Sequence, residues 1–220
     1  MRLRTLAVTP RYAAVDKPPG VAVVPTRTGS ADDCLKAHVE KELGGRIWVV
    51  HRLDKDTSGV VLFAREAEAH RALSMAFERG QAHKRYLALV EGRMERAQTI
   101  DAPIAAGRKG RMRIARAGEQ GKPSQTRVRA LQLFADASLV EAEPLTGRTH
   151  QIRVHLAHAG HPLLVDPLYG KEPPVKLGAV EVARTPLHAA RLEIALDGEA
   201  LKFECEPPAD FAAIVAALQK

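Results

Sequence analysis

A polar loop lies between two apolar runs in the stretch Val50-His51-Arg52-Leu53-Asp54-Lys55-Asp56-Thr57-Ser58-Gly59-Val60-Val61-Leu62-Phe63. The runs, residues 47–50 and 60–64, have the length and composition of buried strands. A charged loop between two packed strands is a common way to position a reactive group. We therefore predict that this loop carries the chemistry of the protein, with Asp54 as the reactive carboxylate.

Length and cysteine content indicate a globular protein that folds without disulfide bonds. The chain has 220 residues, enough for one large domain or two small ones. Its two cysteines, Cys34 and Cys205, lie far apart and lack the spacing of metal ligands. The N-terminus has no apolar signal-type segment, and no run approaches the ~18 apolar residues that span a bilayer. We expect a cytoplasmic protein with no membrane partner.

The charge balance favours a polyanionic partner. Lysine and arginine number 33 against 26 aspartates and glutamates, which gives a formal net charge of +7. Such an excess suits nucleic acid, although a basic soluble protein without such a partner fits it as well. Part of it lies between residues 105 and 127, where basic and small residues are interleaved: Arg108, Lys109, Arg111, Arg113, Arg116, Lys122 and Arg127. This pattern predicts a long, partly exposed basic loop or ribbon suited to nucleic-acid contact, the alternative being a solvated hairpin.

Periodicity and turn residues predict about nine strands and four helices. The strands cover residues 12–15, 21–24, 47–50, 60–64, 84–90, 129–134, 139–142, 188–195 and 201–205. The helices cover residues 31–43, with Ser30 as N-cap, and residues 66–79, 149–159 and 210–218. Because they do not alternate as βαβ units, a parallel Rossmann-type sheet is unfavoured. We predict a single α+β domain over residues 1–220, with a mixed, mostly antiparallel sheet, flanking helices and a central cleft.

Two further segments contain residues suited to chemistry. One is Lys84-Arg85-Tyr86, at the start of a predicted strand. The other, residues 145–156, places a glycine turn before a helix that opens with Arg148, Thr149 and His150. Free N–H groups at a helix start favour an anion, and so do arginine side chains. Arg153 lies one turn into this helix, within reach of an acid from another strand.

Together these segments resemble the RluA-type family of RNA pseudouridine synthases. The loop, written as His-Arg-Leu-Asp-x-x-Thr-Ser-Gly-Val-Val-Leu-Phe-Ala, is similar to the catalytic motif of that family. Other stretches agree with its early Lys-Pro-x-Gly turn, its Lys-x-Tyr strand, its third motif and its downstream segments: residues 16–20, 84–92, 146–153, 161–163, 166–170 and 188–189. The resemblance extends from about residue 12 to residue 211, and five motifs in the same order make it specific.

The resemblance implies the family's fold and its reaction on uridine in RNA. The N1–ribose bond breaks, the base turns, and C5 bonds to the same carbon, with the nucleotide flipped out of the stacked RNA. Asp54 is then the catalytic carboxylate, as a nucleophile at the sugar carbon or as a base on the sugar. Tyr86 is the active-site tyrosine that stacks on the base, and Arg153 pairs with Asp54 and keeps it ionised. No redox step or energy input occurs, so no cofactor or metal is expected.

The implied partner is ribosomal or transfer RNA. Arg52 matches a family residue that contacts RNA and helps to displace the flipped base. The candidates for RNA binding are therefore Arg52, Arg108, Lys109, Arg111, Arg113 and Arg148. Many relatives carry a small N-terminal RNA-binding module, whereas the catalytic motifs of this chain begin by residue 12. We expect no such module, a monomer, and target choice through the basic ribbon.

Other polar residues have structural interpretations. Asp56 is expected to hydrogen-bond within the loop, and His51 to bond the loop backbone. His155 and His158 are spaced i, i+3 on a helix, but no cysteine or glutamate nearby completes a tetrahedral set, so we predict no metal site. The family often has glycine where this chain has Val165, and a β-branched residue disfavours a positive φ, so a more extended turn is expected there.

Two other functions compete with the enzyme on sequence grounds. One is a catalytically silent RNA-binding protein on the same fold, against which the intact set of Asp54, Tyr86 and Arg153 argues. The other is a glycoside hydrolase that uses Asp54 and Asp56. Two carboxylates so close in one loop rarely flank a sugar at the ~5 Å or more that glycoside hydrolysis requires.

Overall fold

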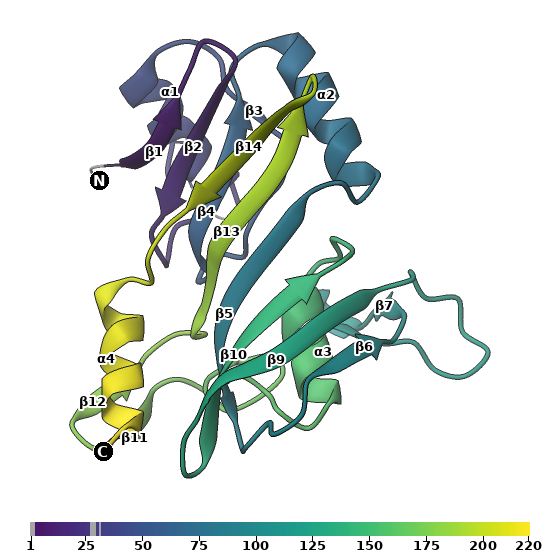
Figure 1. Ribbon diagram of the computed structural model, residues 1–220, viewed down its shortest axis with the longest axis vertical. Helices are drawn as coiled ribbons and strands as arrows, with labels where there is room; N and C mark the ends of the chain where they lie inside the picture. The colour runs from purple at the N-terminus through teal and green to yellow at the C-terminus, as the bar shows by residue number, and fades with distance from the viewer. Residues whose placement is uncertain (1–2, 27–29, 31) are drawn as a thin grey trace. The chain divides into compact units, whose positions relative to one another are not determined.

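The computed structural model describes residues 3–26, 30 and 32–220 of the chain (Figure 1). It divides into two compact units, which are described separately below. The first unit contains residues 1–84 and 188–207, and the second contains residues 85–187 and 208–220. Within the described residues, no helix combines the length and the apolar character that a membrane crossing requires.

The first unit is built on a mixed sheet. Its strands are β1 (Arg4–Val8), β2 (Tyr12–Lys17), β3 (Trp48–Val49), β4 (Ser58–Ala64), β13 (Leu187–Leu196) and β14 (Glu199–Glu204). β1, β2, β4 and β13 are neighbours in that order, β14 pairs with β13, and β3 pairs with β4. Only the pairing of β4 with β13 is parallel, and the others are antiparallel. The predicted mixed, mostly antiparallel sheet is therefore confirmed.

Helix α2 (Ala67–Glu78) covers one face of this sheet at β4 (Figure 1). Every residue of β4 is buried, as its unbroken apolar run predicts. Ala69 and Leu73, spaced four residues apart on one face of α2, pack into the same core cluster as Leu62. Burying a leucine side chain contributes about 1.5–3 kcal/mol, so this contact helps to fix the strand that follows the polar loop.

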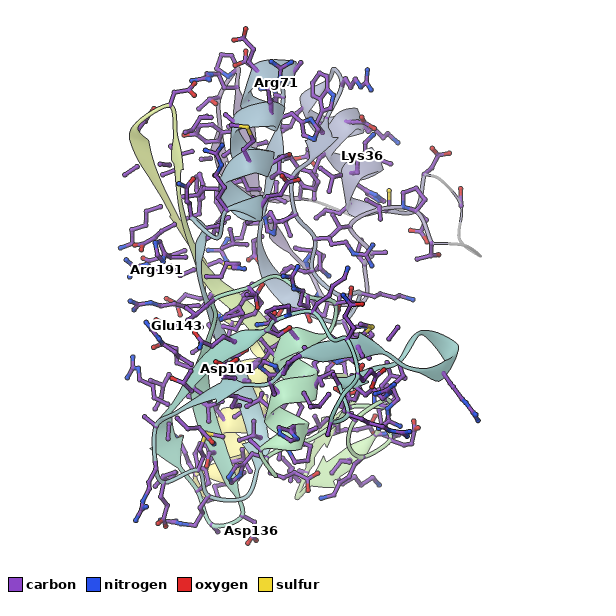
Figure 2. All side chains as sticks on the ribbon, turned by 90° about the vertical axis from the view of Figure 1, so that its right-hand side faces the viewer. Lys36, Arg71, Asp101, Asp136, Glu143 and Arg191 are labelled. Atoms are coloured by element: carbon purple, nitrogen blue, oxygen red, sulfur yellow. The ribbon has the colours of Figure 1, made fainter. Side chains whose placement is uncertain are left out.

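The second unit contains four neighbouring antiparallel strands of the main sheet. Its strands run in the order β5 (His83–Glu91), β10 (Ala137–Pro144), β9 (Gln125–Leu133) and β6 (Gln98–Asp101). Figure 2 labels Asp136 at the turn that joins β9 to β10. Helix α3 (Gln151–His158) packs beside β9 and β10. Helix α4 (Ala209–Leu218) packs on the small sheet formed by β11 (Val175–Leu177) and β12 (Val180–Val182).

The basic segment of the second unit forms the predicted ribbon. β7 (Ile104–Ala106) pairs with β8 (Met112–Ile114), and the 3-10 turn η1 (Arg108–Gly110) joins them. Met112, Arg113 and Ile114 of β8 are only partly exposed because this strand packs on α3.

Two predictions in the first unit are wrong. Residues 21–24 are not a strand, because the carbonyls of Ala22 and Val23 accept the N–H groups of Leu35 and Lys36 at the start of a helix. That helix, α1, spans Leu35–Leu43 and begins later than predicted. Ser30 instead accepts two N–H groups within its own turn, and residues 27–29 and 31 lie outside the described residues.

Val165 takes the place of the family's glycine without a strained backbone. Among the described residues, the only non-glycine residues with positive φ are His150 and Asp197, so Val165 is outside that region. Its side chain is fully buried in the apolar cluster that includes Phe211 and Ile214 of α4. A valine at this position therefore gains core contacts and needs no unusual conformation.

Candidate active site

The polar loop holds Asp54 at the first position of a tight turn. The N–H of Thr57 donates to the carbonyl of Asp54 at 3.2 Å, which closes the turn Asp54–Thr57. Leu53 and Thr57, on either side, are buried, whereas Asp54 is only partly buried and Arg52 is exposed. The two buried neighbours anchor the turn and leave the carboxylate and the arginine accessible.

The fully buried ammonium group of Lys17 holds this turn in place through hydrogen bonds. Its Nζ donates to the carbonyls of Pro18 at 2.9 Å, Val21 at 2.8 Å and Lys55 at 2.8 Å. A lysine ammonium has three N–H donors, so these bonds satisfy it fully. They tie the turn after β2 to the residue that directly follows Asp54, a contact that the sequence analysis did not anticipate.

Replacing Lys17 by methionine should destabilise the protein and disturb the loop. Methionine keeps most of the volume but buries no donor for the three carbonyls that Lys17 serves, at an expected cost of about 2–4 kcal/mol in unfolding free energy. Chemical denaturation measures this cost. Lys36→Met is the control, because Lys36 on α1 is partly exposed and pairs with Glu40, four residues further on (Figure 2). If Lys17→Met lowers the unfolding free energy no more than Lys36→Met does, the hydrogen bonds of Lys17 do not stabilise the turn as proposed.

The other end of the loop is fixed to β13. Ser58 Oγ lies 3.0 Å from His188 Nδ1, and His188 Nε2 lies 3.0 Å from the carbonyl of Cys205. Because that carbonyl can only accept, Nε2 carries the proton and the Ser58 hydroxyl donates to Nδ1. Gly59 has φ +116°, and a Cβ at this position would lie 2.3 Å from the carbonyl oxygen of Ala189. Only glycine allows this close approach of the two parallel strands.

His51 has a structural role, but it bonds the backbone of β4 and not that of the loop. Its Nε2 accepts the N–H of Leu62 in β4 at 2.9 Å, and its ring stacks on Phe77 of α2 at 4.6 Å between centroids. Burial lowers the pKa of His51 to about 3, and the nearby Lys84 ammonium also disfavours the charged imidazole. Burial lowers the pKa of Lys84 itself to about 8. His51 is therefore neutral when the protein is folded.

This neutral histidine should make folding stability depend on pH. The pKa of His51 is about 3 in the folded protein, against 6.5 in the unfolded chain. As pH falls below 6.5 the unfolded chain takes up a proton that the folded protein does not, so the unfolding free energy decreases toward pH 3. His51 contributes at most about 1.4 kcal/mol per pH unit to the slope of the unfolding free energy against pH. Denaturant titrations of wild type and His51→Gln between pH 7 and 4 measure it, and equal slopes in the two proteins would refute this assignment.

The other predicted catalytic residues lie in the second unit, whereas Asp54 lies in the first. Tyr86 is on β5, opposite Ala142 of β10, and it packs against a core cluster that includes Ile152 and Leu156 of α3. The register of β5 and the apolar face of α3 thus place Tyr86 and Arg153 on elements that share one core.

Arg153 makes a buried ion pair that the sequence analysis did not predict. Its Nε and Nη2 donate to the two carboxylate oxygens of Asp166 at 2.8 and 2.7 Å, and both side chains are buried. The same carboxylate accepts the N–H groups of Leu168 and Tyr169, so the loop after Asp166 folds around it. Bidentate pairing fixes the plane of the guanidinium, which gives Arg153 one defined orientation. The signal for this pair was the downstream Asp-Pro-Leu-Tyr-Gly stretch, to which no role had been given.

The start of α3 differs from the predicted anion site. The helix begins at Gln151, two residues later than predicted, because His150 adopts φ 56°. The side-chain oxygen of Gln151 accepts the N–H of Arg148 at 3.0 Å and the hydroxyl of Thr146 at 2.7 Å. The N–H of Arg148 therefore has an acceptor within the loop itself and does not need a bound anion.

His155 and Cys205, which lie outside the polar loop, have environments that indicate structural and not catalytic roles. His155 Nδ1 lies 2.8 Å from the hydroxyl of Thr126, and its Nε2 lies 3.0 Å from the carbonyl of Ala102. Burial raises the pKa of the Cys205 thiol to about 12, so it is not a thiolate nucleophile. Across the described residues, no group of three or more His, Cys, Asp or Glu side chains could hold a metal ion.

The predicted RNA-binding residues of the second unit fall into different environments. Arg108, Arg111 and Arg148 are exposed, and Arg148 Nε donates to the carbonyl of Pro123. Arg113 makes two bonds of 2.6 Å to Glu119, which neutralises its charge. The side chain of Lys109 lies outside the described residues.

Comparison with known proteins agrees with these motifs. Residues 11–158 match the model of the family described as RNA pseudouridylate synthase. The chain is 38% identical over 214 residues to ribosomal large subunit pseudouridine synthase D of Nitrosomonas europaea, which covers 93% of the chain and 62% of that protein. It is 42% identical over 161 residues to ribosomal large subunit pseudouridine synthase C of Yersinia pestis, covering 71% of the chain and 50% of that protein. The chain thus spans half to two thirds of the length of these relatives.

Two solved human structures have the same fold. RNA Pseudouridylate Synthase Domain Containing 4 superposes with a TM-score of 0.80 at 24% identity, over 98% of this chain and 93% of that one. RNA Pseudouridylate Synthase Domain Containing 1 superposes with a TM-score of 0.77 at 27% identity, over 99% and 95%. The family model alone covers more than half of the chain. The chain belongs to the RNA pseudouridylate synthase family.

Proposed function

We propose that this chain is an RNA pseudouridine synthase and that Asp54 is its catalytic carboxylate. The proposal is supported above all by the way the Asp54 turn is held. Lys17 anchors the residue after Asp54, and Ser58 is anchored to His188, yet Asp54 itself is only partly buried. A turn with rigid ends and an accessible acid suits a group that must be aimed at one substrate atom. We further propose that residues 1–220 form one catalytic domain made of the two units.

In the proposed reaction, Asp54 acts on the ribose of a flipped uridine. It either attacks the sugar carbon that carries the base or removes a proton from the sugar, and the N1–ribose bond breaks. The freed base turns and C5 bonds to the same sugar carbon, which releases the Asp54 carboxylate in the first route or is followed by return of the sugar proton in the second. C5 then loses its proton and N1 of the product gains one, so the overall reaction is an isomerisation. Tyr86 stacks on the base during the turn, and Arg153, oriented by Asp166, pairs with Asp54 and favours its ionised form. The product is an isomer of the substrate, so no cofactor or metal has a role in this scheme.

The proposed substrate is ribosomal RNA of the large subunit. The names of the curated relatives support this choice over transfer RNA. Arg52, exposed beside Asp54, would contact the RNA next to the flipped nucleotide. The net charge of +7 suits such a partner. We also propose that the protein acts in the cytoplasm and as a monomer.

Modification mapping tests this function directly. The purified protein is incubated with transcripts of large-subunit ribosomal RNA and, separately, of transfer RNA, and pseudouridine is located by carbodiimide treatment and primer extension. The expected result is a new stop at one or a few uridines of the ribosomal transcript. Stops in transfer RNA alone would correct the substrate. Tight RNA binding without any stop would instead support the catalytically silent binding protein.

The basic ribbon should contribute unequally to RNA binding. Arg108 is exposed, whereas Arg113 is already paired with Glu119. We expect Arg108→Ala to reduce the slope of log Kd against log salt by about 0.7–0.9, the value for one lost phosphate contact, and Arg113→Ala to leave it unchanged. Filter binding at several salt concentrations measures the slope. Arg71→Ala, which removes one exposed charge from α2, controls for net charge (Figure 2). Equal slopes for Arg108→Ala and wild type would show that Arg108 does not contact an RNA phosphate.

A further inference from the structure

Tyr169 joins three parts of the second unit at one side chain. Its hydroxyl accepts the N–H of Met112 in β8 at 2.8 Å and lies 2.9 Å from His150 Nδ1 at the start of α3. Its own N–H donates to the carboxylate of Asp166 at 3.2 Å. The basic ribbon, the start of α3 and the loop after Asp166 therefore meet at this residue.

The ring of Tyr169 also contacts two guanidinium groups. The Cζ atoms of Arg111 and Arg153 lie 5.3 and 5.2 Å from the ring centroid, within the range of cation–π attraction. Two like charges would otherwise repel, and the electron-rich ring attracts both of them. Arg153 belongs to the proposed catalytic set, whereas Arg111 belongs to the ribbon proposed to contact RNA.

Arg111 differs from its neighbour Arg113 in what holds it. Arg113 is bound by Glu119, while the structure gives Arg111 no acidic partner among the residues that it describes. Arg111 is exposed, and its guanidinium contacts the ring of Tyr169. Because a cation–π contact does not neutralise a guanidinium, Arg111 keeps its full charge for a phosphate while its position is restricted.

We propose that Tyr169 is a positioning residue that couples the phosphate-contacting ribbon to Arg153. Its hydroxyl anchors β8 to the start of α3, and its ring holds Arg111 and Arg153 in fixed relation. Asp166 fixes the plane of the Arg153 guanidinium, and Tyr169 places the phosphate-binding Arg111 at a defined position relative to it. This inference rests on the proposed function, because it assigns Arg111 to RNA and Arg153 to the reaction.

Two substitutions separate the roles of the hydroxyl and the ring. Tyr169→Phe removes the bonds to Met112 and His150 but keeps the ring, so we expect RNA affinity to fall about 3–10-fold with little change in kcat. Tyr169→Leu removes the ring as well, so we expect an additional loss of kcat of about 10-fold and a reduced salt slope of RNA binding. Tyr12→Phe is the matched control, because Tyr12 lies in the first unit and packs edge-on against Phe203. It should leave kcat, affinity and slope unchanged.

A double-mutant cycle distinguishes coupling from a general structural role. Arg111→Ala is made in wild type and in Tyr169→Leu, and Kd is measured with a stem–loop transcript of large-subunit ribosomal RNA at several salt concentrations. In wild type, Arg111→Ala should lower the salt slope by about 0.7–0.9. In Tyr169→Leu it should have less than half of that effect, because the guanidinium is no longer held. Additive effects, with thermal unfolding shifted equally in both backgrounds, would overturn the coupling.

The outcome is separable from that of the proposed function. The cycle measures binding only, so it gives a result even if no pseudouridine is formed. If the wild-type protein isomerises uridine but the cycle is additive, the function stands and the role of Tyr169 falls. If binding is coupled but no product appears, Tyr169 orders the ribbon for RNA binding and its link to catalysis through Arg153 is refuted.

Discussion

Asp54→Asn is expected to abolish pseudouridine formation while the protein still folds and binds RNA. Asparagine has nearly the same shape as aspartate but can neither attack the sugar carbon nor take a proton from the sugar. The expected loss of rate is about 10²–10⁴-fold or more. Asp54 is only partly buried, and its carbonyl, which closes the turn, is kept, so stability should change by less than about 1 kcal/mol. Single-turnover assays with excess protein measure the chemical step.

Asp56→Asn is the matched control for this experiment. Asp56 lies two residues away in the same turn and carries the same charge, so the control tests whether the loss follows the position or the net charge of the loop. We expect it to retain most of the activity. If Asp54→Asn keeps the wild-type rate, or if both variants lose activity equally, the assignment of Asp54 is wrong.

Arg153→Met should cause the largest loss of stability among the proposed site residues, and a loss of activity as well. Methionine fills similar space but leaves the carboxylate of Asp166 buried without its cation. Removing one partner of a buried ion pair typically costs about 3–5 kcal/mol. The N–H groups of Leu168 and Tyr169 still bond to Asp166, which places the expected loss near the lower end. Chemical denaturation at neutral pH measures it.

The double variant Arg153→Met with Asp166→Asn separates folding from catalysis. Removing the stranded negative charge should restore most of the unfolding free energy, because a neutral amide is far less costly to bury than a carboxylate. Activity should stay low, since the proposed pairing of Arg153 with Asp54 is still missing. Recovery of activity together with stability would show that Arg153 has a structural role only.

The strands and helices that the sequence predicts well are those whose signal is local. β4 follows from one apolar run, and the hairpin of β13 and β14 follows from Asp197-Gly198, which take φ 50° and 86° as a two-residue turn requires. Residues 21–24 look like a strand by composition. Their carbonyls are instead used by α1 and by Lys17, and such long-range hydrogen bonds leave no trace in a short window.

The same limit applies to the candidate site. The motif around Asp54 could be found in the sequence, and so could a structural role for His51, although its partner is in β4 and not in the loop. The partners that fix the site could not, because Lys17 lies 38 residues from Lys55, and Ser58 lies 130 residues from His188. The pairing of Arg113 with Glu119 was missed for another reason: an isolated acid in a basic segment does not change its overall charge pattern.

The contact between Ser58 and His188 has a consequence for the order of events during synthesis. The first unit is discontinuous in the chain, since residues 188–207 return to it only after most of the second unit has been made. A nascent chain that ends before residue 188 lacks both the histidine and the close strand that Gly59 accommodates. Ribosome-bound chains should therefore gain protection of residues 54–59 from proteolysis late, when the final hairpin emerges.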